Sequence, residues 1–181
     1  EIKIQDTIYK VKITFKSVLK IFELFKENDP QRISKSLKIL GLPNLPNKAY
    51  VLDEISKYIF EIGEKGSGKK KNFDLNYDYK YYFPDFLKYG VNLNKQDVDW
   101  WEFNSILGAI LLNDNSNMKK VLNYRNYEKP SKSEKTNEAI RHQQMMKLKN
   151  KYALPTQYYD NSGFEKLWNY LEKKAGEKKE K

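Results

Sequence analysis

The residues of this chain that could do chemistry are few and scattered. Cysteine is absent, and the single histidine, His142, lies in a basic stretch without an identifiable nucleophile or carboxylate partner. A lone imidazole of this kind is a poor catalytic candidate. The carboxylates are spread through lysine-rich sequence and are not clustered as a hard-cation site prefers. We therefore expect no enzyme, no metal site and no cofactor, although two carboxylates that meet only in the folded chain would escape this test.

A second chemical motif is incomplete. Gly63, Gly68 and Lys69 fit the first part of a phosphate-binding P-loop. The motif also needs a Ser or Thr to hold magnesium, and Lys70 stands in that position. The residues that follow make a poor start for a phosphate-facing helix. We interpret residues 64–72 as a flexible charged linker, because small residues and like charges bury too little to order themselves.

A basic segment is the best candidate for binding. The net charge is +10, and residues 129–151 contribute +5 of it, with seven basic and two acidic residues. The segment has only a thin apolar edge, which predicts a largely exposed helix. Only three of the 34 basic residues are arginines, whose bidentate geometry nucleic-acid readers usually use, so nucleic acid is not the expected partner. We expect contact with an acidic partner through Lys132, Lys135, Arg141, Lys147, Lys149 and Lys151.

The elements that must position these side chains are mostly helices. Residues 1–15 alternate apolar and polar side chains, which predicts a small β-hairpin with its turn at Gln5–Thr7. The apolar spacing then becomes helical, and three helices follow, ending near Asn28–Pro30, at Gly41 and at Gly63. A hairpin alone is marginal in water, so it must pack on another element.

The large apolar side chains concentrate between Phe73 and Leu112. Pro84 suits the first turn of a helix that stops at Gly90, and residues before it form a separate helix that Pro84 ends or kinks. Asp97 or Asp99 can cap the next helix. We expect a packing core and not a base-stacking platform, because hardly any basic residues interleave with these aromatic ones. The expected core residues are Phe83, Phe86, Trp100, Trp101, Phe103, Leu107 and Ile110.

Beyond this core, the loop Asn113–Asn117 offers Ser116 or Asn117 as a cap for a short helix. The basic helix ends at Pro155, and one short amphipathic element follows. The sequence thus predicts a mainly α protein with an N-terminal hairpin and a compact multi-helix bundle. The expected ranges are 1–63 (hairpin plus helices), 64–72 (linker), 73–128 (aromatic-rich helical core) and 129–181 (basic helix and C-terminal tail).

No run approaches the roughly 20 apolar residues that a membrane span needs, and the start of the chain lacks a signal-peptide pattern. The absence of cysteine is consistent with a reducing compartment. We therefore expect a soluble, intracellular protein without a membrane partner.

Several motifs follow one another in a fixed order: Asp78, Phe86, Tyr89–Leu93, Trp100–Trp101 with Phe103 and Leu107, Tyr124–Arg125, the Lys-rich helix and Tyr152–Pro155. Each is weak alone, but the ordered set resembles a family of small proteins from phages and prophages of Gram-positive bacteria. The resemblance covers Ile2 to Pro155. The sequence departs from the family pattern at Asp99, where a histidine often precedes the tryptophans, and at Pro84.

The resemblance implies a gene in the tail module, just ahead of the tape-measure gene, in a position similar to that of tail assembly chaperones. It implies a non-enzymatic tail assembly factor that binds the tape-measure protein, with other tail assembly proteins as further partners, in the cytoplasm of the bacterial host. The argument rests on gene order and analogy. Two alternatives stay open: a structural tail component retained in the virion, and a nucleic-acid-binding module that uses the Lys-rich helix 129–151. The sequence does not indicate an oligomeric state.

Overall fold

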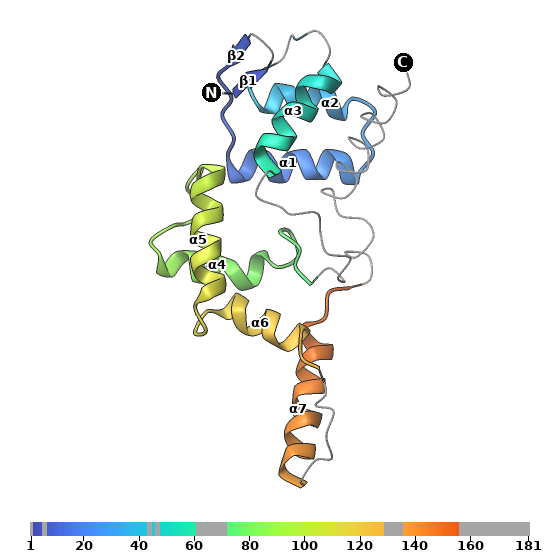
Figure 1. Cartoon of the computed structure of the whole chain (residues 1–181), viewed down its shortest axis with the longest axis vertical. Helices are drawn as coiled ribbons and strands as arrows, with labels where there is room; N and C mark the ends of the chain where they lie inside the picture. Colours follow the sequence, from blue (N-terminus) through green and yellow to red (C-terminus); the bar gives the residue numbers. More distant parts are fainter. Residues whose placement is uncertain are drawn as a thin grey trace. The chain divides into compact units, whose positions relative to one another are not determined.

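The computed structural model describes residues 2–4, 7–42, 45, 48–60, 72–128 and 136–155. Within these ranges the chain is mainly α-helical, which confirms the predicted fold class, and it has one small sheet (Figure 1). The elements in order are β1 (Ile2–Ile4), β2 (Thr7–Tyr9), α1 (Phe15–Lys26), α2 (Arg32–Ile39), α3 (Lys48–Phe60), α4 (Tyr79–Lys88), α5 (Trp100–Leu112), α6 (Asn117–Arg125) and α7 (Thr136–Tyr152). The predicted helix stop at Gly63, most of the linker 64–72 and the element after Pro155 lie outside the described residues.

Contacts divide the chain into two compact units. Among the described residues, unit 1 comprises the hairpin, α1, α2, α3 and residues 97–103. Unit 2 comprises residues 72–96 and, after residue 103, the rest of α5 with α6 and α7. Residues 97–103 are thus grouped with the N-terminal helices. The ranges expected from the sequence, 1–63 and 73–128, do not predict this long-range grouping.

The N-terminal hairpin is antiparallel, with Ile2 opposite Tyr9, as the alternating pattern predicts. The expectation that the strand pattern extends to Phe15 is wrong, because α1 begins at that residue. Thr14 caps the helix: its Oγ1 accepts a hydrogen bond from the Ser17 N–H at 3.2 Å, and Ser17 Oγ accepts one from the Thr14 N–H at 2.8 Å. Such a capping box fixes the start of a helix through local polar groups that an alternating apolar pattern does not reveal.

The interior of unit 1 is mainly apolar, with a few buried serine and threonine side chains. Helix α1 contacts α2, α2 contacts α3, and α3 contacts β1, so the hairpin does pack on a helix (Figure 1). The buried apolar residues are Ile13, Phe15, Val18, Ile21, Phe22, Phe25, Leu37, Leu40, Val51, Leu52, Ile55, Val98, Trp100 and Phe103. Their number and spacing are those expected when amphipathic helices turn one apolar face inward.

A short backbone pairing joins the start of α1 to the start of α5. The Phe15 N–H donates to the Val98 carbonyl at 2.9 Å, and the Trp100 N–H donates to the Ile13 carbonyl at 3.0 Å. The rings of Phe15 and Phe103 then stack with their centroids 4.2 Å apart. The first turn of α5 is therefore held in unit 1 by both backbone and ring contacts.

Two glycines end helices as predicted. Gly41 follows α2 with φ +84°, and Gly90 follows α4 with φ +78°. After α2, the Gly41 N–H donates to the Lys38 carbonyl at 3.1 Å and the Leu42 N–H donates to the Leu37 carbonyl at 2.8 Å. Gly90 and the residue after it form the same two bonds at the end of α4. This is the Schellman arrangement, which requires a left-handed residue that glycine adopts without a steric penalty.

The predictions that Pro84 begins one helix and that it ends another are wrong, because Pro84 lies inside α4. The alternative that Pro84 kinks the helix stays a prediction. Proline cannot donate to the carbonyl four residues earlier, that of Lys80. Both residues are exposed, so solvent can hydrogen-bond the carbonyl that Pro84 leaves unpaired. The buried side of α4, which includes Tyr82 and Phe86, continues across the proline and keeps the helix in one piece.

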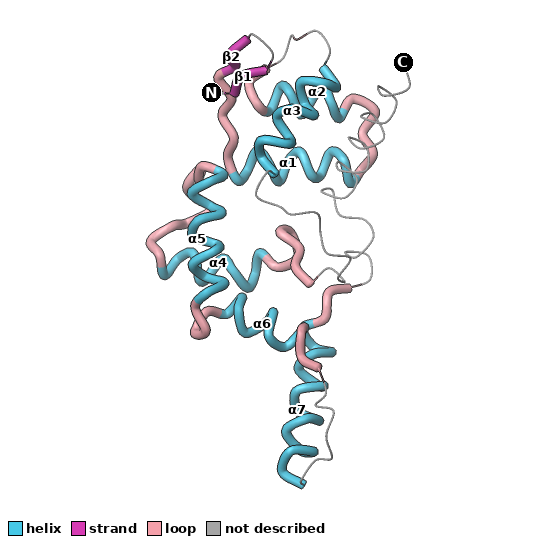
Figure 2. Tube along the Cα trace, viewed as in Figure 1, coloured by secondary structure: helices cyan, strands magenta, loops and turns pink. Residues whose placement is uncertain are grey.

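Unit 2 is built around α4 and α6, which contact each other, and α6 also contacts α7. Figure 2 shows helix as the main element in this part of the chain as well. The buried apolar residues of the unit are Tyr82, Phe86, Leu93, Leu107, Ile110, Met118, Val121 and Leu154.

The structure also decides between the alternative helix caps. Asp99 caps α5, where its Oδ1 accepts a hydrogen bond from the Trp101 N–H at 2.9 Å. Ser116 caps α6, where its Oγ accepts one from the Lys119 N–H at 3.1 Å. A side-chain oxygen in this position satisfies one of the backbone donors that a helix start leaves unpaired.

Candidate functional site

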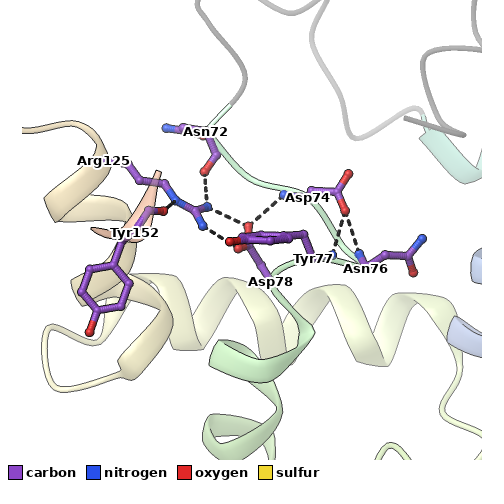
Figure 3. A network of polar contacts seen from close by, with 7 residues as sticks. All are labelled: Asn72, Asp74, Asn76, Tyr77, Asp78, Arg125 and Tyr152. Carbon is purple, nitrogen blue, oxygen red and sulfur yellow. Dashed lines mark hydrogen bonds and ion pairs between the residues drawn. The ribbon is translucent and has the colours of Figure 1, made fainter. Parts of the chain in front are cut away.

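The most concentrated polar contacts of unit 2 surround the guanidinium of Arg125, at the end of α6 (Figure 3). Its Nη2 and Nη1 donate to the two carboxylate oxygens of Asp78 at 2.7 Å and 2.8 Å. Nη1 also donates to the Asn72 carbonyl at 2.7 Å, and Nε donates to the Tyr152 carbonyl at 2.6 Å. The four hydrogen bonds use most of the five donors of a guanidinium.

The Arg125–Asp78 pair is buried, with the two side chains 4% and 0% exposed. A buried charge is tolerated when it is paired and when its remaining donors and acceptors are satisfied. The network meets that condition. Its members come from four places in the sequence: the segment before α4, the residue before α4, the end of α6 and the end of α7.

A second carboxylate shapes the segment that leads into α4. Asp74 Oδ1 accepts hydrogen bonds from the N–H groups of Asn76 and Tyr77 at 3.0 Å and 2.9 Å, and the Asp74 N–H donates to Asp78 Oδ2 at 2.9 Å (Figure 3). Asp and Asn side chains commonly bond the backbone two residues on in this way. The turn therefore helps to hold Asp78 in position to pair with Arg125.

A third carboxylate, Asp85 of α4, lies at the other end of α6. Its Oδ2 accepts a hydrogen bond from the Met118 N–H at 3.0 Å, and its Oδ1 accepts bonds from Asn117 Nδ2 at 3.1 Å and Lys88 Nζ at 2.9 Å. A negative group is favourable at a helix N-terminus because the backbone N–H groups and the helix dipole face it. Asp85, near the end of α4, thus bonds the start of α6, and Asp78, just before α4, pairs with Arg125 at the end of α6. The two helices are therefore antiparallel.

The burial of Tyr82 belongs to the same region. Its hydroxyl donates to the Leu75 carbonyl at 2.7 Å, which satisfies the polar end of a ring that is otherwise in the apolar core. Burial raises the pKa of Tyr82, and nearby Tyr79, Asp78 and Asp74 act in the same direction. The side chain is therefore a neutral structural group.

Helix α7 is fixed to the rest of unit 2 along one side. Arg125 binds the carbonyl of Tyr152, and the Tyr152 ring stacks on Tyr124 with centroids 5.3 Å apart. Further back along α7, Lys149 Nζ donates to the Tyr127 carbonyl at 2.6 Å, and His142 Nδ1 shares a hydrogen bond with the Tyr127 hydroxyl at 3.1 Å.

These contacts define two faces of α7. The inner face carries partly buried residues at helical spacing: His142, Met145, Leu148, Lys149 and Tyr152. The outer face, which we define as Ile140, Gln143, Gln144, Met146, Lys147, Asn150 and Lys151, is exposed throughout. It combines apolar side chains, with Ile140 53% and Met146 36% exposed, and cationic ones.

The predicted partner-binding residues therefore divide into three groups. Arg141, Lys147 and Lys151 are exposed, whereas Lys149 is partly buried and bonded to a backbone carbonyl. Lys132 and Lys135 lie outside the described residues. His142, which the sequence offers only as a poor catalytic candidate, is partly buried in the contact with Tyr127.

Some of the predicted packing residues are buried and others are only half-buried. Trp100, Phe103, Leu107, Ile110 and Phe86 are buried. Trp101 and Phe83 are half-buried, and the Phe83 ring stacks on Tyr79 with centroids 5.2 Å apart.

Sequence reasoning missed the ion pair itself. Asp78 and Arg125 belong to separate sequence motifs, and neither motif predicts their pairing across 47 residues. One signal was available: Arg125 is one of three arginines in a lysine-rich chain, and arginine is the preferred partner of a carboxylate in a buried, bidentate pair.

Among the described residues, no group of three or more acidic or histidine side chains gathers as a metal ion would need. None of the described helices has both the length and the apolar character required to cross a bilayer.

The fold and these contacts define a class of protein. It is a mainly α-helical protein in which a buried polar network holds the end of α7, a helix with an exposed, partly cationic face. The chain belongs to the bacteriophage Gp15 protein family, whose model matches residues 1–154. The match includes both units, and it confirms the prediction of a bacteriophage protein family. No curated protein and no solved structure matches the chain.

Proposed function

We propose that the protein is a non-enzymatic tail assembly factor of phages and prophages of Gram-positive bacteria. In this proposal its gene lies just upstream of the tape-measure gene, and the protein acts in the host cytoplasm as a chaperone of the tape-measure protein during tail morphogenesis. Membership of a bacteriophage protein family supports the phage origin that this proposal assumes.

The observation that carries the proposal is the outer face of α7. It presents apolar and cationic side chains together on a helix whose inner face is already held by α6 and Arg125. An amphipathic helical segment can dock on such a face through its own apolar residues, while its acidic residues meet the lysines. The helix is anchored before binding, so little ordering of the chain is required when a partner docks.

Part of the charge on α7 has a simpler role. Lys149 and Lys151 lie in the last turn, where cations favour the helix dipole. That role does not account for the outer-face cation Lys147, which is exposed and lies before the last turn. It does not account for the apolar Ile140 either, which is exposed at the other end of the helix.

Co-expression with the cognate tape-measure protein tests the proposal. We expect a soluble complex that co-purifies, and a double variant Lys147→Glu and Lys151→Glu that loses most of it. The matched control is the double variant Lys20→Glu and Lys120→Glu, which makes the same change of charge at exposed positions of α1 and α6. The control should co-purify like the parent protein.

If the two proteins never co-purify and deletion of the gene leaves tails intact, the proposal is wrong. Mass spectrometry of purified particles distinguishes a chaperone, which is absent from the virion, from a structural tail component that is retained in it. Nucleic-acid binding by the basic helix would appear as an affinity that falls steeply with salt.

A further inference from the structure

A cluster of tyrosines and lysines in unit 2 is not explained by the polar network or by the outer face of α7. We define this tyrosine–lysine patch as Tyr77, Lys80, Tyr81, Tyr124, Lys151 and Tyr152. Its residues come from α4 and the turn before it, from α6 and from α7. The tyrosines are all half-buried and the two lysines are exposed, so the patch is a surface feature.

The rings and the ammonium groups contact one another in a continuous series. Lys80 Nζ lies 4.3 Å from the ring centroid of Tyr77 and 5.0 Å from that of Tyr81. The Tyr81 ring meets Tyr152 edge-on at 5.7 Å, and Lys151 Nζ lies 5.4 Å from the Tyr152 centroid. Such cation–π and ring contacts hold long lysine side chains in place at a surface.

The charge of this patch is positive and has no counterion within unit 2 as described. No carboxylate of the described residues forms an ion pair with Lys80 or Lys151. The nearest acidic groups in the sequence are already used, since Asp78 binds Arg125 and Asp74 accepts backbone N–H groups. Lys80 and Lys151 therefore place two ammonium groups on a partly apolar surface, without an ion pair to any described carboxylate.

We infer that the tyrosine–lysine patch recognises the carboxylates of an acidic protein segment. The inference deepens and rests on the proposed function, because it extends the binding surface from α7 to α4. Lys151 also belongs to the outer face of α7, one turn after Lys147. A segment lying along that face meets Lys147, then Lys151, and continues over the tyrosine rings to Lys80.

The geometry favours acidic protein over single-stranded nucleic acid. Bases bind such surfaces by stacking on open aromatic faces. Here Lys80 occupies ring faces of Tyr77 and Tyr81, and Tyr124 and Tyr152 stack on each other. The arginine of the region, Arg125, is buried and donates four hydrogen bonds within the network, so the guanidinium that commonly contacts phosphate is not presented. Ammonium groups held over tyrosine rings suit carboxylates instead.

The probe is a fluorescently labelled poly-L-glutamate peptide, and the measurement is the change of its anisotropy on titration with the full chain at low salt. The double variant Lys80→Met and Lys151→Met removes both ammonium groups and keeps an unbranched side chain. Its matched control is Lys20→Met and Lys120→Met, which removes the same charge from exposed positions of α1 and α6. Circular dichroism verifies that both variants are folded.

We expect the patch variant to bind the peptide at least about tenfold more weakly than the parent protein, and the control variant to bind it less than about twofold more weakly. A tenfold change in affinity corresponds to about 1.4 kcal/mol. Equal losses in the two variants overturn the inference, because binding then follows net charge alone. Labelled oligothymidylate that binds more tightly than the peptide and is lost in the patch variant also overturns it, and assigns the patch to nucleic acid.

These outcomes are separable from those of the co-purification test. If the tape-measure protein does not co-purify but the patch variant loses peptide binding selectively, the proposed function fails and the patch stands as an acid-binding surface. If the tape-measure protein co-purifies equally with the parent and the patch variant, and peptide binding is unchanged, the inference fails while the proposed function stands.

Discussion

The interiors of the two units of the protein contain different kinds of side-chain contact. Unit 1 is held by apolar and aromatic side chains, such as the stacked Phe15 and Phe103, and its described ion pairs are at the surface, such as Lys57 with Asp53. Unit 2 also has an apolar core, but it adds a buried ion pair whose members are bonded to backbone groups. Among the described residues, the unit with the candidate binding helix is the one that adds a buried ion pair.

This difference has a physical rationale. Apolar contacts are non-directional and tolerate small shifts, whereas a bidentate pair fixes the angle and the distance between its partners. Helix α7 has a thin inner face, so apolar burial alone would position it weakly. The bond from Arg125 to the Tyr152 carbonyl fixes the end of α7 at a defined place on α6.

The largest effect is expected for Arg125→Met in unit 2. The change leaves the buried Asp78 carboxylate without its partner and frees the end of α7. Loss of one member of a buried pair typically lowers the free energy of unfolding by about 3–5 kcal/mol. Urea unfolding followed by circular dichroism measures the loss.

The control for this variant is Lys120→Met, which removes an exposed cation of the same helix and should change stability by less than about 0.5 kcal/mol. The double variant Asp78→Asn with Arg125→Met removes both charges and should be more stable than Arg125→Met alone. A loss below about 1 kcal/mol for Arg125→Met would show that the pair behaves like a surface pair, and the contrast between the units would not hold.

The second effect concerns the apolar unit. Phe103→Leu removes the ring that stacks on Phe15 and lies 5.6 Å from the Trp100 ring, but it retains an apolar side chain. We expect a loss of roughly 1–2 kcal/mol, between that of a volume-conserving exchange and that of truncation to alanine. The loss should not depend on salt, because no charge is involved. A strong salt dependence of the difference from the parent protein would contradict the apolar description of unit 1.

The smallest effect concerns a surface charge of unit 1. A hydrogen bond from Thr14, followed by the bond and charge of Lys12, holds the pKa of Asp97 below 3.8 in spite of partial burial. Because the folded-state pKa is depressed, the contribution of Asp97 to stability is present above pH 3.8 and is lost as the pH falls through the folded pKa.

Asp97→Asn should therefore lower the free energy of unfolding at neutral pH by less than about 0.5 kcal/mol, since the side chain of Asp97 is 45% exposed and that of Lys12 is 80% exposed. Urea unfolding of both proteins at neutral pH and at about pH 3 should show the difference shrinking in acid. A difference that grows in acid has the wrong sign for this mechanism.

Much of the fold could be predicted because it depends on local patterns. The helical spacing of α1, α2 and α3 and the left-handed glycines Gly41 and Gly90 are properties of neighbouring residues. Where local rules compete, prediction failed: Pro84 lies within a helix because tertiary burial of the rest of α4 outweighs one lost hydrogen bond.

The candidate site was only partly predictable. The exposed cations of α7 follow from composition and spacing, because a segment with so few apolar residues cannot be buried. The bonding of Lys149 to the Tyr127 carbonyl does not follow from them, since it depends on where α6 ends in space. The tyrosine–lysine patch likewise combines residues of α4, α6 and α7 that share no sequence pattern.

The sequence by itself determined the mainly helical class, most helix ends and the cationic character of residues 129–151, because each depends on residues within a few positions of one another. The tertiary structure decided which distant residues meet. It placed residues 97–103 with the N-terminal helices and brought Arg125 to Asp78. Periodicity specifies which face of a helix is buried but not which other face it meets, and the choice of partner is made by packing and by the need to satisfy every buried charge.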